Sequence, residues 1–210
     1  MAAVGALQPG SEFGGFRIEA VEREAVFRAR DEHREVALHV ASEPPAALAT
    51  IRFLERARRL RSIQHPHLLA VYATEMLDGH CVAITQAPPG RRLDRMRPEC
   101  VAAIRTVRQV AEAVDALEAA GAEPPPLNAT RIWVDEHGDA RLDGLDAHAA
   151  PHPAASSSAA LAHLLRELQP RRRRTLEPIL TRATDGAYLS AGQFAGRSRR
   201  SNLNAAETER

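Results

Sequence analysis

The sequence predicts an α+β fold in two parts, a β-rich first part and a helical second part. Short β-like runs occur within residues 16–40 and 68–86, and residues 16–21 alternate apolar and polar side chains, a pattern typical of half-buried strands. Beyond the Pro-rich segment 87–90, apolar residues recur mainly at helical spacing. This order indicates two lobes joined by a linker, with one helix inserted among the strands of the first lobe.

Five strands are expected in the first lobe, at residues 16–21, 25–30, 35–40, 68–74 and 81–86. The last two are expected to be joined by the turn Asp78-Gly79. The inserted helix is expected at about residues 46–63, ended by Pro66 and its neighbours. Its arginines lie opposite an expected buried face of Leu48, Ile51, Leu54, Ala57 and Leu60.

The second lobe is expected to begin with a long helix from about Pro98 to Ala120, followed by Gly121 as its stop. A proline-rich loop and a hairpin come next, and the chain then returns to helices. The expected elements are a hairpin of residues 131–134 and 140–142, a loop at 147–158, and helices at 159–168, 175–183 and near 190.

Composition limits the function classes. The chain has 210 residues and a formal net charge of +1, so no global field draws it to nucleic acid or membrane. It has no apolar run of membrane-spanning length and no secretory signal. The two cysteines, Cys81 and Cys100, are therefore expected to be reduced in a cytoplasmic protein. All 28 basic residues are arginine, so a mechanism that needs a lysine ammonium has no residue to supply it.

Six segments, in order, are similar to the motifs of bacterial serine/threonine protein kinases. They are LQPGSEFGGFRI, VFRARDEHREVALHV, RFLERARRLRSIQHPHLLAVY, VRQVAEAVDALEAAG, IWVDEHGDARLDGLDA and SAALAHLLREL, which span roughly residues 7–195. The resemblance implies a protein-kinase-like two-lobe fold whose N-lobe holds one αC-type helix and whose helical C-lobe is reduced. It divides the chain into a flexible N-terminus (1–15), an N-lobe (16–87), a shortened C-lobe (88–195) and a disordered tail (196–210).

Kinase chemistry depends on positioning and charge stabilisation, so each catalytic position matters. The resemblance places the glycine-rich loop on Glu22-Arg23-Glu24, a shortened segment without glycine whose two carboxylates would repel phosphate. It places the phosphate-anchoring lysine on His39 and its partner glutamate on Arg56. Glu55, one residue away, lies on another helix face. His39 and Arg56 are therefore expected to be ordinary surface or groove residues.

The catalytic loop departs further from the family pattern. The resemblance places the catalytic base on Pro126, the following lysine on Asn128 and the metal-binding asparagine on Arg131, a cation that would oppose Mg²⁺. The Asp-Phe-Gly motif falls on Gly144-Leu145-Asp146. A gap of one residue would instead place Asp143 at the metal position, which makes it a weak candidate for holding a cofactor.

The activation segment is expected to be almost absent. About ten residues follow Ala147 before the next helix, and they contain no Ala-Pro-Glu motif. The arginine that would pair with that glutamate is expected just before Tyr188 and is replaced by Ala187. A shortened segment would uncover C-lobe surface, and an exposed apolar patch there would mark an interface.

These features predict a catalytically inactive pseudokinase, without cofactor or metal, that serves as a scaffold or allosteric regulator of another protein, such as an active kinase. One alternative is an atypical kinase or nucleotide-binding protein that uses Asp143 for metal and Arg58 for phosphate. The candidate partner-binding patch is Arg56, Arg58, Arg59 and Arg61.

A second alternative is an arginine-patch module that binds nucleic acid, with further clusters at 171–174 and at Arg197, Arg199 and Arg200. Aromatic residues make up only 4%, however, which leaves few stacking platforms. A solvated helix face in an arginine-rich chain remains the plainer interpretation of these clusters. Two histidine pairs, His65 with His67 and His148 with His152, are weak metal candidates.

Overall fold

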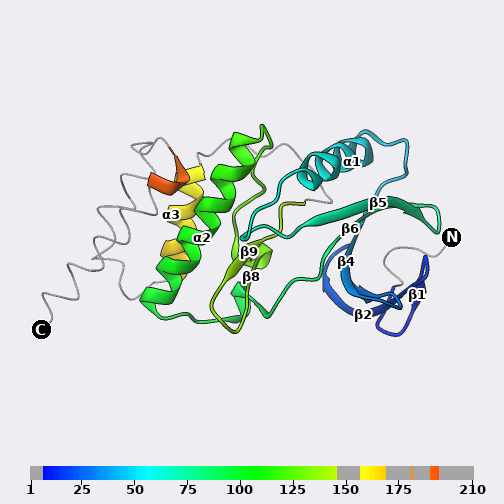
Figure 1. Cartoon of the computed structure of the whole chain (residues 1–210), viewed down its shortest axis with the longest axis horizontal. Coiled ribbons are helices and arrows are strands. Elements are labelled where there is room, and N and C mark those ends of the chain that lie inside the picture. The colour runs from blue at the N-terminus through cyan, green and yellow to red at the C-terminus, as the bar shows by residue number, and fades with distance from the viewer. Residues whose placement is uncertain (1–6, 146–156, 169–180, 182–189, 194–210) are drawn as a thin grey trace, which may run out of the picture. The chain divides into compact units, whose positions relative to one another are not determined.

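The computed structural model describes residues 7–145, 157–168, 181 and 190–193 (Figure 1). The chain forms two compact units. The first comprises Met1–His65, Leu69–Pro88 and Gly144–Pro151, and the second comprises Pro66–Leu68, Pro89–Asp143 and His152–Arg210. The chain passes from the first unit to the second after Pro88, one residue beyond the boundary expected from the linker sequence.

A six-stranded antiparallel sheet forms the first unit, with the strand order β1-β2-β3-β4-β6-β5. Its strands are β1 (Glu12–Phe13), β2 (Phe16–Arg23), β3 (Val26–Arg30), β4 (Glu35–Val40), β5 (Val71–Leu77) and β6 (His80–Gln86). Asp78 and Gly79 join β5 to β6, and both have positive φ, 49° and 84°. This conformation suits a two-residue hairpin turn, so the predicted Asp78-Gly79 turn is confirmed.

The N-terminal segment contributes to the core of this sheet. Leu7 is 7% exposed and Phe13 is 1% exposed, and both belong to the cluster of buried apolar side chains around β4. Strand β1 pairs with β2, and Gly14 N donates to Asp78 Oδ2 at 3.0 Å. The prediction that residues 1–15 are flexible is therefore wrong for residues 7–15, because two large apolar side chains there are buried.

Helix α1 (Leu48–Arg61) packs on β5 and β6 through Thr50, Phe53, Ala57 and Leu60. The predicted buried face was wrong at its first two positions, because Leu48 is 62% and Ile51 is 43% exposed. Residues 50, 53, 57 and 60 follow a 3-4-3 spacing that keeps one face toward the sheet. The hydroxyl of Thr50 can be buried there because it donates to Glu43 O at 3.0 Å.

Helix α2 (Cys100–Ala119) is the long helix of the second unit and packs against β9 and α3. The other elements are β7 (Arg91–Arg92), β8 (Ile132–Val134), β9 (Ala140–Leu142), α3 (Ser157–Leu168) and the 3₁₀ helices η2 (Leu93–Arg95) and η3 (Ala129–Arg131). Strands β7, β8 and β9 form a small antiparallel sheet. Before β7, Gly90 has φ +65° and lies against β8, where an added Cβ would stand 2.2 Å from Val134 O. Only glycine fits there.

Several predictions concern residues outside the described part of the chain. They include the loop at 147–156, the helix at 175–183, Asp146, Ala187, His148 with His152, the tail at 196–210, and the arginine clusters at 171–174 and 197–200. Among the residues that are described, no helix is long and apolar enough to cross a membrane.

Truncating one side chain from each face of α1 tests which face packs on the sheet. Phe53 is 0% exposed, so Phe53→Ala is expected to lower the free energy of unfolding by about 3–5 kcal/mol. Ile51→Ala, the matched variant on the exposed face, is expected to change it by less than about 0.5 kcal/mol. Urea titration followed by circular dichroism measures both. An equal loss of stability in the two variants would contradict the observed burial of the Phe53 face.

Candidate functional site

The hairpin at the expected phosphate-binding position is a tight turn. Arg23 of β2 pairs directly with Val26 of β3, so only Glu24 and Ala25 connect the strands. Ala25 has φ 58° and is buried. A two-residue turn leaves no length of backbone to wrap around a phosphate chain, and it contains no glycine that would permit close approach.

The charge of this hairpin differs from the expectation. Glu22 accepts a hydrogen bond from Arg28 Nε at 2.7 Å, and the opposite charges form an ion pair. Arg28 also donates to Glu35 and to Pro88 O. The expected repulsion by two carboxylates is therefore reduced, because Glu22 already has a cationic partner. The missing glycines and the short turn remain the features that disfavour phosphate binding.

His39 lies in the interior of the sheet. It is 1% exposed on β4, between Val26 of β3 and Ala83 of β6. Its Nε2 lies 3.2 Å from Thr85 Oγ1. The expectation that His39 is a surface or groove residue is wrong, because the central strand β4 is buried from Val36 onward.

Arg56 holds the segment that follows β9. Its Nε donates to Gly144 O at 2.8 Å, and Arg23 at the end of β2 donates to the next carbonyl, Leu145 O, at 3.4 Å. Gly144 lies against Leu60 of α1, where an added Cβ would stand 3.2 Å from Leu60 Cδ1. Arg56 is only partly exposed, whereas Glu55 beside it is exposed. At the position expected for the αC glutamate, the chain thus has a cation that binds a backbone carbonyl.

The segment expected to form the catalytic loop runs without regular structure through Pro126 and then enters η3. Asn128 caps η3, because its Oδ1 accepts from Thr130 N at 3.1 Å and from Thr130 Oγ1 at 2.6 Å. Pro126 has no ionisable group. The two residues at the expected positions of the base and the following lysine therefore shape the backbone.

Arg131 and Asp143 are both buried and occupy adjacent backbone positions. Arg131 is 7% exposed and Asp143 is 4% exposed. Asp143 N donates to Arg131 O at 2.8 Å, which extends the ladder between β8 and β9 by one bond. The residue opposite Asp143, the candidate metal ligand proposed from the sequence, is therefore a buried arginine. Within the described residues, no group of three His, Cys, Asp or Glu side chains could hold a metal ion.

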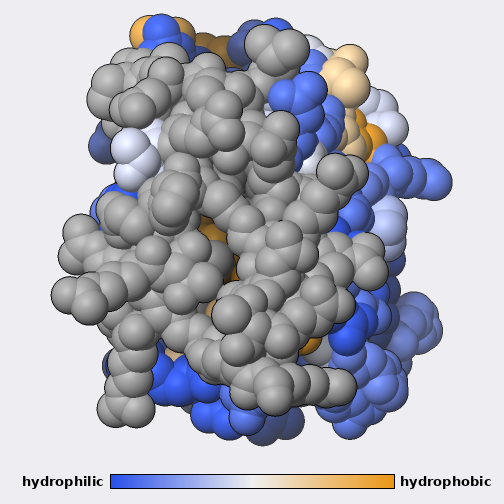
Figure 2. Space-filling model, turned by 90° about the vertical axis from the view of Figure 1, so that its left-hand side faces the viewer, coloured by the Kyte–Doolittle hydropathy of each residue, from blue (hydrophilic) through white to orange (hydrophobic). Residues whose placement is uncertain are grey.

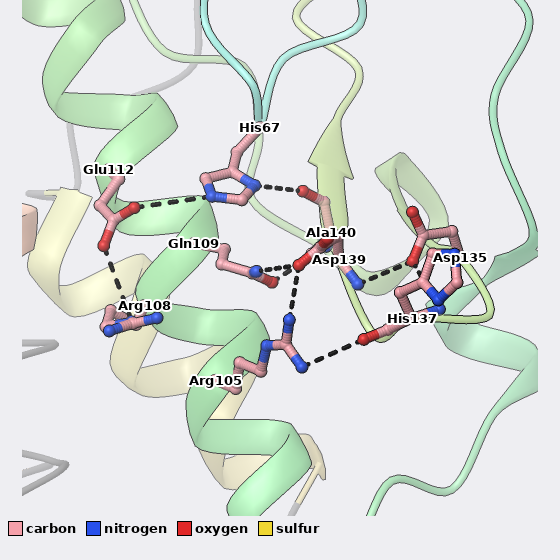
Figure 3. Close-up of polar contacts among 9 residues, drawn as sticks. All are labelled: His67, Arg105, Arg108, Gln109, Glu112, Asp135, His137, Asp139 and Ala140. Atoms are coloured by element: carbon pink, nitrogen blue, oxygen red, sulfur yellow. Dashed lines mark hydrogen bonds and ion pairs between the residues drawn. The ribbon is translucent and has the colours of Figure 1, made fainter.

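A polar network that sequence reasoning missed ties α2 to the β8–β9 hairpin (Figure 3). Gln109 donates Nε2 to Asp139 Oδ1 at 2.9 Å and accepts from Ala140 N at 2.9 Å. Arg105 donates to the same Asp139 oxygen at 2.6 Å and to His137 O at 3.1 Å. Hydrogen bonds from Gln109 and Arg105 hold the pKa of Asp139 below its usual value.

His67 belongs to this network and has both ring nitrogens near polar partners. Nδ1 lies 2.9 Å from Ala140 O, so it must carry the proton, because a carbonyl only accepts. Nε2 lies 3.6 Å from Glu112 Oε2, and Leu142 N donates to His67 O at 2.8 Å. The weak metal candidate His67 therefore has a structural role in joining segment 66–68 to the hairpin. No spacing in the sequence indicates these long-range pairs.

The four arginines of the predicted partner patch do not share one role. Arg58, Arg59 and Arg61 are exposed at the end of α1, whereas Arg56 turns its Nε to Gly144 O. A cation near a helix C-terminus complements the partial negative charge there, so part of this cluster has a purely structural explanation.

Comparison with solved structures shows the fold. The PknI kinase domain of Mycobacterium tuberculosis superposes with a TM-score of 0.72 at 19% identity, over 94% of this chain and 99% of that one. A single-substitution variant of that domain gives 0.74 at 19% identity, with the same shares. A double-substitution variant gives 0.69 at 22% identity, over 94% of this chain and 100% of that one. At the level of sequence, neither a protein-family model nor a curated protein matches the chain.

The chain therefore has a bacterial protein-kinase-like fold, of the α+β class that the sequence predicts. At this low identity the superposition establishes the fold and carries no activity across. The observed element order, with one helix inserted in the sheet and a helical second unit, agrees with the expected order of motifs.

The role of Arg56 predicts a local effect on stability. Arg56→Ala removes the hydrogen bond to Gly144 O and is expected to lower the free energy of unfolding by about 1–2 kcal/mol. Amide hydrogen exchange at 143–145 is expected to quicken in the same variant. Arg58→Ala, one half-turn away on the exposed face, is the matched control and is expected to leave both quantities unchanged. Identical behaviour of the two variants would refute the anchoring role.

The Asp139 network predicts a dependence on acid. Because the folded pKa of Asp139 is lowered, its contribution to stability is present above its unfolded pKa of about 3.9 and is lost as pH falls through the lower folded value. Asp139→Asn is therefore expected to weaken the loss of stability on acidification below about pH 4. Glu136→Gln, which alters an exposed carboxylate in the same hairpin, serves as the control in urea titrations across this range.

Proposed function

We propose that this protein is a catalytically inactive pseudokinase that acts by binding another protein. The observation that carries the proposal is the set of side chains at the positions that the resemblance assigns to phosphoryl transfer. Pro126 stands at the base, Arg131 at a metal ligand and His39 at the phosphate-anchoring lysine, and a two-residue turn stands at the phosphate-binding loop. Each of these positions needs a specific group for the reaction to proceed.

The described residues do not fit a Mg-nucleotide. Magnesium prefers several oxygen ligands, whereas Asp143 supplies a single carboxylate. Asp143 is 4% exposed, and the residue bonded to it in the ladder is the buried Arg131. The phosphate chain would need a cation in the place of His39, which is 1% exposed in the sheet. An imidazole can be buried in its neutral form, and in that form it does not supply the missing charge.

Protein binding is proposed because the chain keeps the kinase-like fold but has other residues at the positions that the resemblance assigns to phosphoryl transfer. The sheet has a continuous core, and the contacts of Arg56 and Arg23 fix the segment after β9 without a nucleotide. Such a preformed scaffold presents surfaces at little conformational cost, which favours recognition of a partner. A role as scaffold or allosteric regulator rests on this argument together with the analogy of fold.

The proposal predicts that Mg-ATP does not stabilise the protein. A ligand that binds only the folded state at 100 times its dissociation constant adds about 2.7 kcal/mol, which would raise Tm by roughly 5–10 °C in a domain of this size. A shift below about 1 °C is expected in millimolar Mg-ATP, measured by differential scanning fluorimetry.

The controls use the one carboxylate at the candidate metal position. A clear shift in Tm that disappears in Asp143→Ala would support the atypical nucleotide-binding alternative in place of this proposal. Radioactive phosphate transferred to any protein, and lost in the same variant, would do so more strongly. Pro126→Ala alters the expected base position without removing a carboxylate and should behave as the unaltered protein in both assays.

A further inference from the structure

The exposed side of α1 combines apolar and cationic side chains. Residues three and four apart lie on one helix face, and here they define the outer face of α1, which is Leu48, Ile51, Arg52, Glu55, Arg58 and Arg59. All six are exposed. The face is about 16 Å long, the rise of eleven residues of helix. Arg61 lies about 120° around the helix from Glu55, which is in the middle of the face, and Arg56 turns to Gly144 O, so neither belongs to it.

The apolar end of this face is unusual within the described part of the chain. In all the described residues, five large apolar side chains are strongly exposed, namely Val21, Leu48, Ile51, Met76 and Val101. Leu48 and Ile51 are the two that share one turn of a helix. A bound partner that covered both side chains would gain the free energy of burying them. A single exposed apolar residue needs no explanation, but a pair flanked by charges is typical of recognition surfaces.

Among its described residues, the second unit has no comparable pair of exposed apolar side chains. In Figure 2 most atoms of the visible face are grey, and the described atoms around them are largely blue with small orange areas between them. Of the exposed large apolar residues in the described part of that unit, Val101 stands alone. The apolar patch that was expected to lie uncovered on the C-lobe therefore has no counterpart among the described residues, and α1 is the better candidate for docking.

The charges of the outer face are not balanced within the described structure. Arg52, Arg58 and Arg59 form no ion pair with another described residue, and neither does Glu55. Three other arginines of the same unit do have carboxylate partners, namely Arg28 and Arg30 of β3 and Arg34 in the turn before β4. The helix dipole explains cations in the last turn but not Arg52, which lies in the second turn.

We infer that the outer face of α1 binds an acidic amphipathic helix of a partner protein. Three guanidiniums against one carboxylate call for a segment with at least two Asp or Glu side chains, and Leu48 with Ile51 call for bulky apolar side chains at its other end. A helix of about three turns matches the length of the face. The inference deepens the proposed function, because it names the chemistry of the partner that the pseudokinase would hold.

Selection of peptides on the whole protein tests this inference. A displayed library of random peptides is panned on the full chain, and the recovered peptides are synthesised and titrated by fluorescence anisotropy at low and physiological salt. We expect enrichment of Asp, Glu and bulky apolar residues. In the variant Arg52→Gln, Arg58→Gln, Arg59→Gln, affinity is expected to fall roughly tenfold at low salt, and less at physiological salt.

Two further variants separate charge and shape. Arg91→Gln, Arg95→Gln, Arg97→Gln removes the same charge from exposed positions of the second unit and should leave affinity unchanged. Leu48→Ala, Ile51→Ala should weaken binding several-fold, while alanine preserves the helix. Circular dichroism checks that each variant is folded.

Several outcomes would overturn the inference. They are the recovery of no binding peptide, peptides without acidic enrichment, and equal affinity for the triple variants of α1 and of the second unit. A random DNA duplex that binds more tightly than the peptides, through the same arginines, would identify a nucleic-acid surface instead. Sedimentation that reveals a dimer abolished by Leu48→Ala, Ile51→Ala would identify contact between copies of this chain.

The inference and the proposed function can fail separately. The outer-face variants leave His39, Pro126, Arg131 and Asp143 unaltered, so phosphate transfer can be assayed on the same proteins. Transfer together with arginine-dependent peptide binding would refute the pseudokinase and leave the docking face standing. No transfer together with peptide binding that ignores the arginines would refute the docking face alone.

Discussion

The burial of β4 is the constraint on which the rest of this structure depends. Each residue from Val36 to Val40 is nearly inaccessible, and the strand is hydrogen-bonded to β3 on one side and β6 on the other. An ammonium at position 39 would therefore need a charged partner, because an unpaired buried charge costs several kcal/mol. His39 avoids that cost, and α1 is then free to carry an arginine where the resemblance expects an acid. Without an ammonium at position 39, the chain no longer needs an acidic partner for it on α1.

Arginine has three different roles in this lysine-free chain. On the sheet, Arg28 bridges Glu22 and Glu35 across strands. On the inner edge of α1, Arg56 binds a backbone carbonyl, a contact that its planar, forked donor group makes well. Arg34 instead lies over the Tyr72 ring, 4.7 Å from its centroid. A count of basic residues alone would have merged these roles into one cationic surface.

The sequence predicted where helices and strands lie better than it predicted which of their side chains are buried and what those side chains contact. The strand predicted at residues 35–40 matches β4 to the residue, and the turn at Asp78-Gly79 followed from residue types that tolerate positive φ. The phase of α1 was wrong because leucine and isoleucine were counted while Phe53 and a buried threonine were overlooked. The network of Gln109, Asp139 and His67 joins residues up to 73 positions apart, so no local pattern could indicate it.

The pairing of β1 with β2 has a practical consequence for anyone who shortens this polypeptide. A chain trimmed to start at Phe16, where the sequence predicts that the N-lobe begins, would lose Leu7 and Phe13 from the interior. It would also leave the free edge of β2 open to pairing with other molecules. Such a fragment would tend to aggregate, and insolubility would then be mistaken for a property of the whole protein.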